Sequence, residues 1–262
     1  MILASATSQI GGPAIVFALV LAEIAVGGIA VLWLVPAWGN VRDAFFKLAG
    51  GVLAACAVFA WLAARAPLRG ADTRATILLA AFAASAVVWQ LLLWAGARSP
   101  SRLVGMASSP VGVAAFIVLS ANDAVPRSAF VAAFQLLAGA LVMGAVVDGL
   151  LLGHWHLVDR KAAKAPLERI NYLFLAGCAA AAAAVLLGGT GAGVARSDLS
   201  PLLGVGVLTV SIAVGMMALC ALIGSFIRAL IKEDSMQSAT GLFYLGVIMA
   251  VAGEFAAKVR FF

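Results

Sequence analysis

Charged residues are scarce in this sequence. Of its 262 residues, only 11% are Asp, Glu, Lys or Arg, whereas 65% are hydrophobic. A soluble domain has about a quarter of its residues charged, so the composition excludes a soluble globular protein. The mean hydropathy is +1.12, and apolar runs of about 20 residues, the length that spans a bilayer, recur along the chain.

Histidine and cysteine are also few, which limits the cofactor chemistry. The chain has two histidines and three cysteines. Cys56, Cys178 and Cys220 lie in apolar runs without CxxC spacing, so we expect neither an iron–sulfur cluster nor an internal disulfide. GxSxG, HExxH and P-loop motifs are also missing from the sequence. We therefore expect no catalytic centre within this chain.

Eight apolar runs separated by short turns predict the fold. The class is all-α: a polytopic bundle of about eight transmembrane helices, with residues 1–262 forming a single integral membrane domain and no soluble domain. The expected spans are 13–36, 44–64, 76–97, 102–121, 128–153, 170–189, 202–231 and 238–259.

The basic residues predict the orientation, because positive charge favours the cytoplasmic side. Ten of the 17 fall on the odd-numbered connections: Arg42, Lys47, Arg98, Arg102, Arg160, Lys161, Lys164, Arg169, Arg228 and Lys232. The other seven fall on the opposite side: Arg65, Arg69, Arg74, Arg127, Arg196, Lys258 and Arg260. We expect a bacterial inner (cytoplasmic) membrane with both termini outside. The net charge of +6 indicates contact with the lipid bilayer and not nucleic acid.

Glu23 is the sharpest functional signal, because it lies in the middle of the first apolar run. An unpaired charge there costs about 3 kcal/mol on insertion scales. No Lys or Arg lies near the middle of any other expected span, so a salt bridge is not expected and Glu23 should be protonated. It would then contact a quinone or carry protons. The alternative is a structural hydrogen bond, to Gln90 or Gln135.

Asp148 is the second acid within a span. Ala140, Gly144 and Asp148 recur at intervals of four, which places a small-residue stripe and a carboxylate on one helix face. Asp148 is a candidate quinone or proton contact, or alternatively an interfacial acid paired with a nearby Arg or Lys. Gln90 and Gln135 are weaker candidates, because such amides commonly hydrogen-bond one helix to another.

The segment GHWHLVDRK contains the only histidines, His154 and His156, around Trp155. On a helix, residues i and i+2 point about 200° apart and cannot share a metal ion, and haem within this chain alone is not expected. We interpret His154, Trp155, His156, Arg160 and Lys161 as an edge that faces lipid headgroups or a partner subunit. Farther on, Glu254 and Lys258 are four apart, which predicts an ion pair on the helix surface.

In its layout the chain resembles the NrfD, polysulfide-reductase and DMSO-reductase type of membrane anchor subunit. The shared features are eight spans, short loops, no soluble domain and a last span that ends GEFAAKVRFF. The resemblance implies a haem-free anchor that binds quinone and passes electrons or protons to an iron–sulfur or cytochrome protein.

We therefore expect an integral subunit of a respiratory or photosynthetic redox complex. A small-solute or ion transporter that uses Glu23 at its midplane is the main rival, and a structural scaffold subunit is the third possibility.

Overall fold

The computed structural model describes residues 13–69, 71–122, 128–159, 162–189 and 205–261. Within these residues all regular structure is helical, and eight helices are long and apolar enough to cross a membrane. Lipid offers backbone groups no hydrogen-bond partner, so long apolar segments satisfy their own as helices. The predicted all-α bundle of eight spans is confirmed, and the protein is a membrane protein.

The first span consists of α1 (Pro13–Leu32) and the short α2 (Val35–Trp38). The other seven are α3 (Asp43–Ala64), α4 (Thr73–Trp94), α5 (Arg98–Ser120), α6 (Ala129–Val158), α7 (Ala165–Leu187), α8 (Val205–Lys232) and α9 (Met236–Phe261). The largest departures from the expected ranges are at the end of α6, which continues to Val158 past Gly153, and at the start of α7, which begins at Ala165 and not at 170. That glycine does not end the helix; a side chain there would meet Thr240 of α9.

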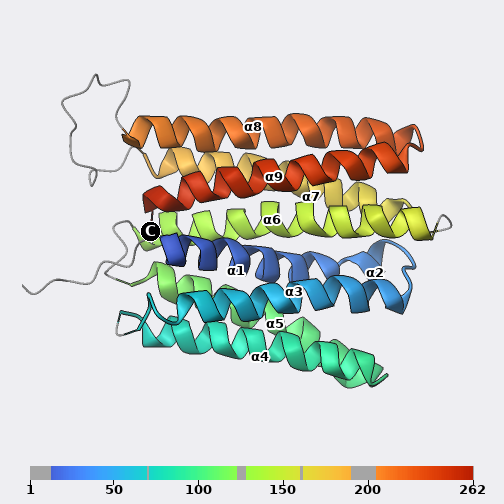
Figure 1. Cartoon of the computed structure of the whole chain (residues 1–262), viewed down its shortest axis with the longest axis horizontal. Coiled ribbons are helices and arrows are strands. Elements are labelled where there is room, and N and C mark those ends of the chain that lie inside the picture. Colours follow the sequence, from blue (N-terminus) through green and yellow to red (C-terminus); the bar gives the residue numbers. More distant parts are fainter. Residues whose placement is uncertain (1–12, 70, 123–127, 160–161, 190–204, 262) are drawn as a thin grey trace, which may run out of the picture.

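The eight spans form two halves, with α1, α3, α4 and α5 in one and α6, α7, α8 and α9 in the other, and the halves lie side by side in Figure 1. In the first half α3 packs on α1, α4 on α3, and α5 on both α4 and α1. In the second half α7 packs on α6, α8 on α7, and α9 on both α8 and α6. Both halves thus have the same cyclic order of helices. They meet mainly where α1 packs on α6, with α9 also contacting α1.

Glycine permits the close contact between α1 and α6. A Cβ atom on Gly27 would collide with the carbonyl of Ala140, and one on Gly144 with the backbone of Gly27 and Gly28. Helices in lipid gain stability from such close backbone approach, since no hydrophobic effect drives them together. The small-residue stripe expected on α6 is therefore confirmed as the contact surface between the halves.

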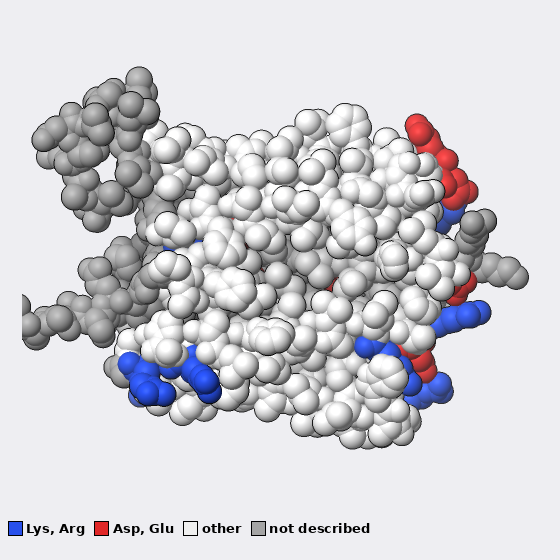
Figure 2. All heavy atoms as spheres, viewed as in Figure 1, with Lys and Arg blue, Asp and Glu red and all other residues white. Residues whose placement is uncertain are grey.

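Charged side chains gather at the two ends of the bundle, and the visible face between them is largely uncharged (Figure 2). This distribution fits a bilayer around the middle of the helices. The start of α1 and the end of α9 lie at the same end (Figure 1). The placement of that end outside the cell stays a prediction.

Candidate functional site

Three charged side chains meet inside the bundle, between the two halves. The ammonium nitrogen of Lys258 on α9 lies 2.7 Å from Glu23 Oε1 on α1 and 2.8 Å from Glu254 Oε2 on its own helix. All three are buried, with 0%, 2% and 1% of Glu23, Glu254 and Lys258 exposed. We call these residues the charge cluster.

The charge cluster lies within the membrane-spanning helices. Glu23 is ten residues into α1, about 15 Å along the axis at 1.5 Å per residue, which is about half the thickness of the hydrocarbon core. Lys258 starts close to the end of α9. Its side chain nevertheless reaches inward, because each Cα–Cβ bond tilts toward the N-terminus of the helix, and the N-terminus of α9 is at the opposite end of the bundle.

Helix α6 closes the third side of the charge cluster. Lys258 Nζ also donates to the backbone carbonyl of Gln135, at 3.4 Å. One turn further along α6, Gly139 leaves the space that the Glu23 carboxylate occupies, since a Cβ atom there would overlap its oxygens. Two carboxylates thus share one ammonium group, and a single proton or monovalent cation would balance the charge.

Two expectations from the sequence are wrong here. Glu23 does have a cationic partner, and the pair of Glu254 and Lys258 is buried and not on the helix surface. Both differences have one physical cause: Lys258 is near the end of the last span in the sequence, but its side chain points inward along α9 and reaches Glu23. The i, i+4 spacing of Glu254 and Lys258 was the signal that could have indicated this direction.

Asp148 is a second buried acid, on α6. It lies nearer the end of the bundle opposite to the charge cluster. It is 0% exposed, and neither carboxylate oxygen has a hydrogen-bond partner among the described residues. It lies one turn beyond Gly144, on the face of α6 that packs against α1. The alternative of pairing with a nearby Arg or Lys finds no support in this part of the chain. The glycine contact between α1 and α6 separates Asp148 from the charge cluster.

The two glutamines connect helices. Gln90 Nε2 of α4 donates to the Phe46 carbonyl of α3 at 3.4 Å, and Gln135 Nε2 of α6 donates to the Ala184 carbonyl of α7 at 3.3 Å. These bonds bear out the interpretation of both amides as links between helices. Neither side chain hydrogen-bonds to Glu23 in the structure, whereas the backbone of Gln135 belongs to the surroundings of the charge cluster.

No known family model matches the chain. Searches of the curated proteins and of the solved structures also find no match. The resemblance to the NrfD group of membrane anchors thus stays an expectation.

The two histidines lie on α6, at different depths of burial. His154 is exposed and His156 is buried. The His156 ring nitrogens lie 2.8 Å from the Leu152 carbonyl and 3.0 Å from the Ala163 carbonyl. The ring therefore links the last turns of α6 to the connection between α6 and α7. Trp155 is half-buried between them. Arg160 and Lys161 of the expected edge lie outside the described residues.

Within the described ranges no three His, Cys, Asp or Glu side chains come together in a way that could hold a metal ion. Quinone as a ligand stays a prediction. The groups brought together for chemistry are therefore the two carboxylates and one ammonium of the charge cluster, with Asp148 farther along α6.

Proposed function

We propose that the chain transports protons across the membrane, alone or coupled to a small solute, with the charge cluster as its proton-binding site. The observation that carries the proposal is the burial of Glu23, Glu254 and Lys258, with one acid more than bases, at the contact between the two halves.

Ionisable groups at this depth are costly, and membrane proteins keep them mainly on paths for ions and protons. A structural role would be served as well by apolar residues, because a buried ion pair rarely adds net stability over a well-packed apolar core. In many transporters built from two related halves, the site for the coupling ion lies near the midplane, between the halves. The charge cluster likewise lies within the spans and between the two halves.

The geometry links protonation to the contact between the halves. Glu254 is on the same helix as Lys258, so this pair persists when the halves move apart. Glu23 is on α1, so its ion pair with Lys258 is the one in the cluster that crosses between the halves. A proton on Glu23 removes its charge and weakens this ion pair. Proton binding would thereby favour separation of α1 from α9, which is the kind of two-state element that alternating access requires.

Asp148 is a candidate second station for the proton on the other side of the glycine contact. Its carboxylate is buried and unpartnered among the described residues, and it lies nine residues beyond Gly139, about 13 Å along α6. A proton that leaves the charge cluster would reach Asp148 only after α1 and α6 loosen at Gly27 and Gly144.

A pH jump over proteoliposomes on a solid support tests this function. Protons that enter the charge cluster displace charge within the membrane, and this current needs no knowledge of the solute. We expect the current in the wild type and its loss in Glu23→Gln, which keeps the shape but cannot titrate. Glu168→Gln is the matched control, because Glu168 is outside the cluster and its partner is the exposed Tyr172 hydroxyl. No current in the wild type, or an unchanged current in Glu23→Gln, would refute the proposal.

The redox-subunit function remains a second prediction, with quinone as ligand and an iron–sulfur or cytochrome partner. A cavity of about 150 Å³ opens beside the end of α9, lined by Pro13, Val16, Phe255 and Val259. A quinone ring there would touch apolar side chains only, because neither Glu254 nor Lys258 lines the cavity, and we therefore place transport first. Purification in mild detergent, with identification of bound proteins and an absorbance spectrum, tests the redox alternative.

A further inference from the structure

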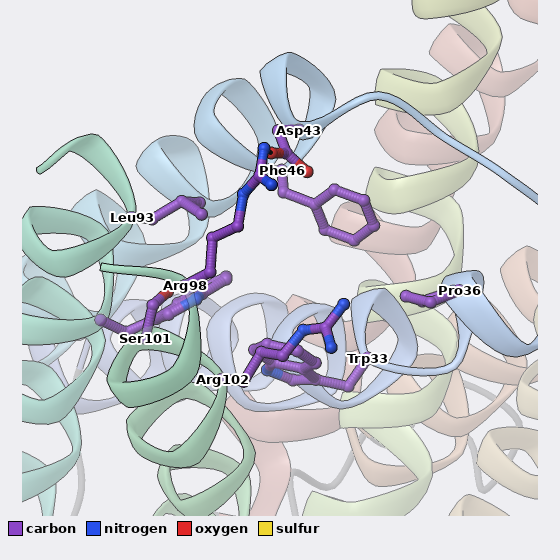
Figure 3. A pocket seen from close by; sticks show the side chains of 9 residues that line it. Trp33, Pro36, Asp43, Phe46, Leu93, Arg98, Ser101 and Arg102 are labelled. Atoms are coloured by element: carbon purple, nitrogen blue, oxygen red, sulfur yellow. Dashed lines mark hydrogen bonds and ion pairs between the residues drawn. The ribbon is translucent and has the colours of Figure 1, made fainter. Parts of the chain in front are cut away.

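A second site lies within the first half of the bundle, away from the charge cluster. A cavity of about 70 Å³ opens at the end of the bundle where α5 begins. Trp33, which follows α1, and residues of α2, α3 and α4 also contribute to it. Figure 3 shows Arg98 beside Asp43 on one side, Arg102 beside Trp33 on the other, and Phe46 between them. The cavity thus combines basic and aromatic side chains.

One basic side chain of this cavity has no acidic partner and can bind an anion. Arg98 is paired with Asp43 at 2.7 Å. Arg102 has no carboxylate within ion-pair distance among the described residues, so the cavity carries one excess positive charge. The indole N–H of Trp33 is buried and has no hydrogen-bond partner in this part of the chain. The exposed guanidinium group of Arg102 is therefore available to a ligand, and a small shift of the side chains that cover the Trp33 ring would open its N–H donor to the same ligand.

The remaining walls are apolar and continue onto the outer surface. Trp33 and Trp89 pack with their ring centroids 5.7 Å apart. Directly after Arg102, the side chains of Leu103 and Met106 are 72% and 62% exposed on α5. A ligand held at Arg102 thus has an exposed apolar surface beside it, running toward the middle of the membrane.

We propose that this cavity binds the phosphate group of an anionic phospholipid. The guanidinium of Arg102 and the indole N–H of Trp33 donate to phosphate oxygens, and the acyl chains lie along Leu103 and Met106. Arginine suits this role because its planar group donates two parallel hydrogen bonds to one phosphate. The cavity has room for a headgroup and not for a whole lipid, so the chains must lie on the outer surface. A free phosphate ion would make no use of that surface.

Native mass spectrometry of the full chain from nanodiscs of equal parts phosphatidylglycerol and phosphatidylcholine tests the site. We expect the wild type to retain phosphatidylglycerol in preference to phosphatidylcholine, and Arg102→Gln to reduce this retention about tenfold, the effect of losing one charged hydrogen bond. Arg74→Gln is the matched control, because Arg74 is an exposed arginine at the other end of the bundle. Equal retention of the two lipids by the wild type, or equal loss in both variants, would overturn the proposal.

Two further measurements separate the remaining possibilities. Trp33→Phe keeps the ring and removes only the N–H, so it should weaken phosphatidylglycerol retention without changing helix content by circular dichroism. This variant tests the site even where Arg102→Gln does not fold. Millimolar inorganic phosphate should leave the bound lipid in place. Its displacement by inorganic phosphate would identify the free anion as the ligand and contradict the lipid assignment.

Discussion

Replacing Lys258 by methionine should strongly destabilise the bundle. The substitution keeps the length of the side chain but leaves Glu23 and Glu254 buried without their cation. At 2.7 Å and an effective dielectric constant of about 20, one such ion pair is worth about 6 kcal/mol before desolvation is subtracted. Removal of one partner from a buried pair typically costs about 3–5 kcal/mol. We expect a loss of this size in the free energy of unfolding.

The assay is equilibrium unfolding by sodium dodecyl sulfate in mixed micelles, followed by circular dichroism. The triple variant Glu23→Gln, Glu254→Gln, Lys258→Met removes all the charges together, so it should recover to within about 1–2 kcal/mol of the wild type. Lys232→Met, at an exposed lysine on the last turn of α8, should stay within about 0.5 kcal/mol.

A small effect of Lys258→Met, similar to that of Lys232→Met, would mean that the charge cluster is not buried as described. A triple variant that is as unstable as Lys258→Met would also refute the reasoning, because the destabilisation would then come from lost packing and not from unpaired charge. The two outcomes are distinguished by the same titration.

Three further substitutions test other contacts in the same unfolding assay. Gly144→Ala should lower the free energy of unfolding by about 1–3 kcal/mol, because its Cβ would meet the backbone of α1. Gly51→Ala, with open space around it, should raise it by about 0.5–1 kcal/mol, and equal effects would contradict the close contact of α1 and α6. Asp148→Leu should raise stability by about 1 kcal/mol or more, since it removes a buried polar group without a described partner, and a loss would show that Asp148 has a partner. His156→Ala should lower the free energy of unfolding by about 1–3 kcal/mol, because the contacts of its ring with two carbonyl groups are lost. His154→Ala, at an exposed site, should lower it by about 0.5 kcal/mol or less, and a larger loss for His154→Ala than for His156→Ala would be inconsistent with the structure.

The sequence predicted the spans well, because a bilayer leaves an apolar chain few alternatives to the helix. Glu23 and Asp148 stood out for the same reason, as carboxylates in apolar runs. The small-residue stripe of α6 also indicated its packing surface correctly, since close approach of helices requires small side chains. These properties are local, and each can be recognised in a short window of sequence.

What the sequence did not predict depends on which helices become neighbours. The partner of Glu23 comes from the last span, and nothing near Glu23 in the sequence points to it. The arrangement of two halves with equal cyclic order was also not expected, because no internal repeat is evident in the sequence. The cavity at Arg98 and Arg102 is formed by four helices, so its residues become a site only once those helices are packed.

The bond between Glu23 and Lys258 joins the first described span to the last, and this has a consequence for biosynthesis. Lys258 leaves the ribosome about 235 residues after Glu23, which at 5–20 residues per second is a delay of about 10–50 seconds. During this interval α1 is already made, and its carboxylate has to wait in the translocon, in the headgroup region or in a protonated form. Completion of the last helix would then act as a late checkpoint, and chains truncated before it should be preferred substrates for membrane proteases.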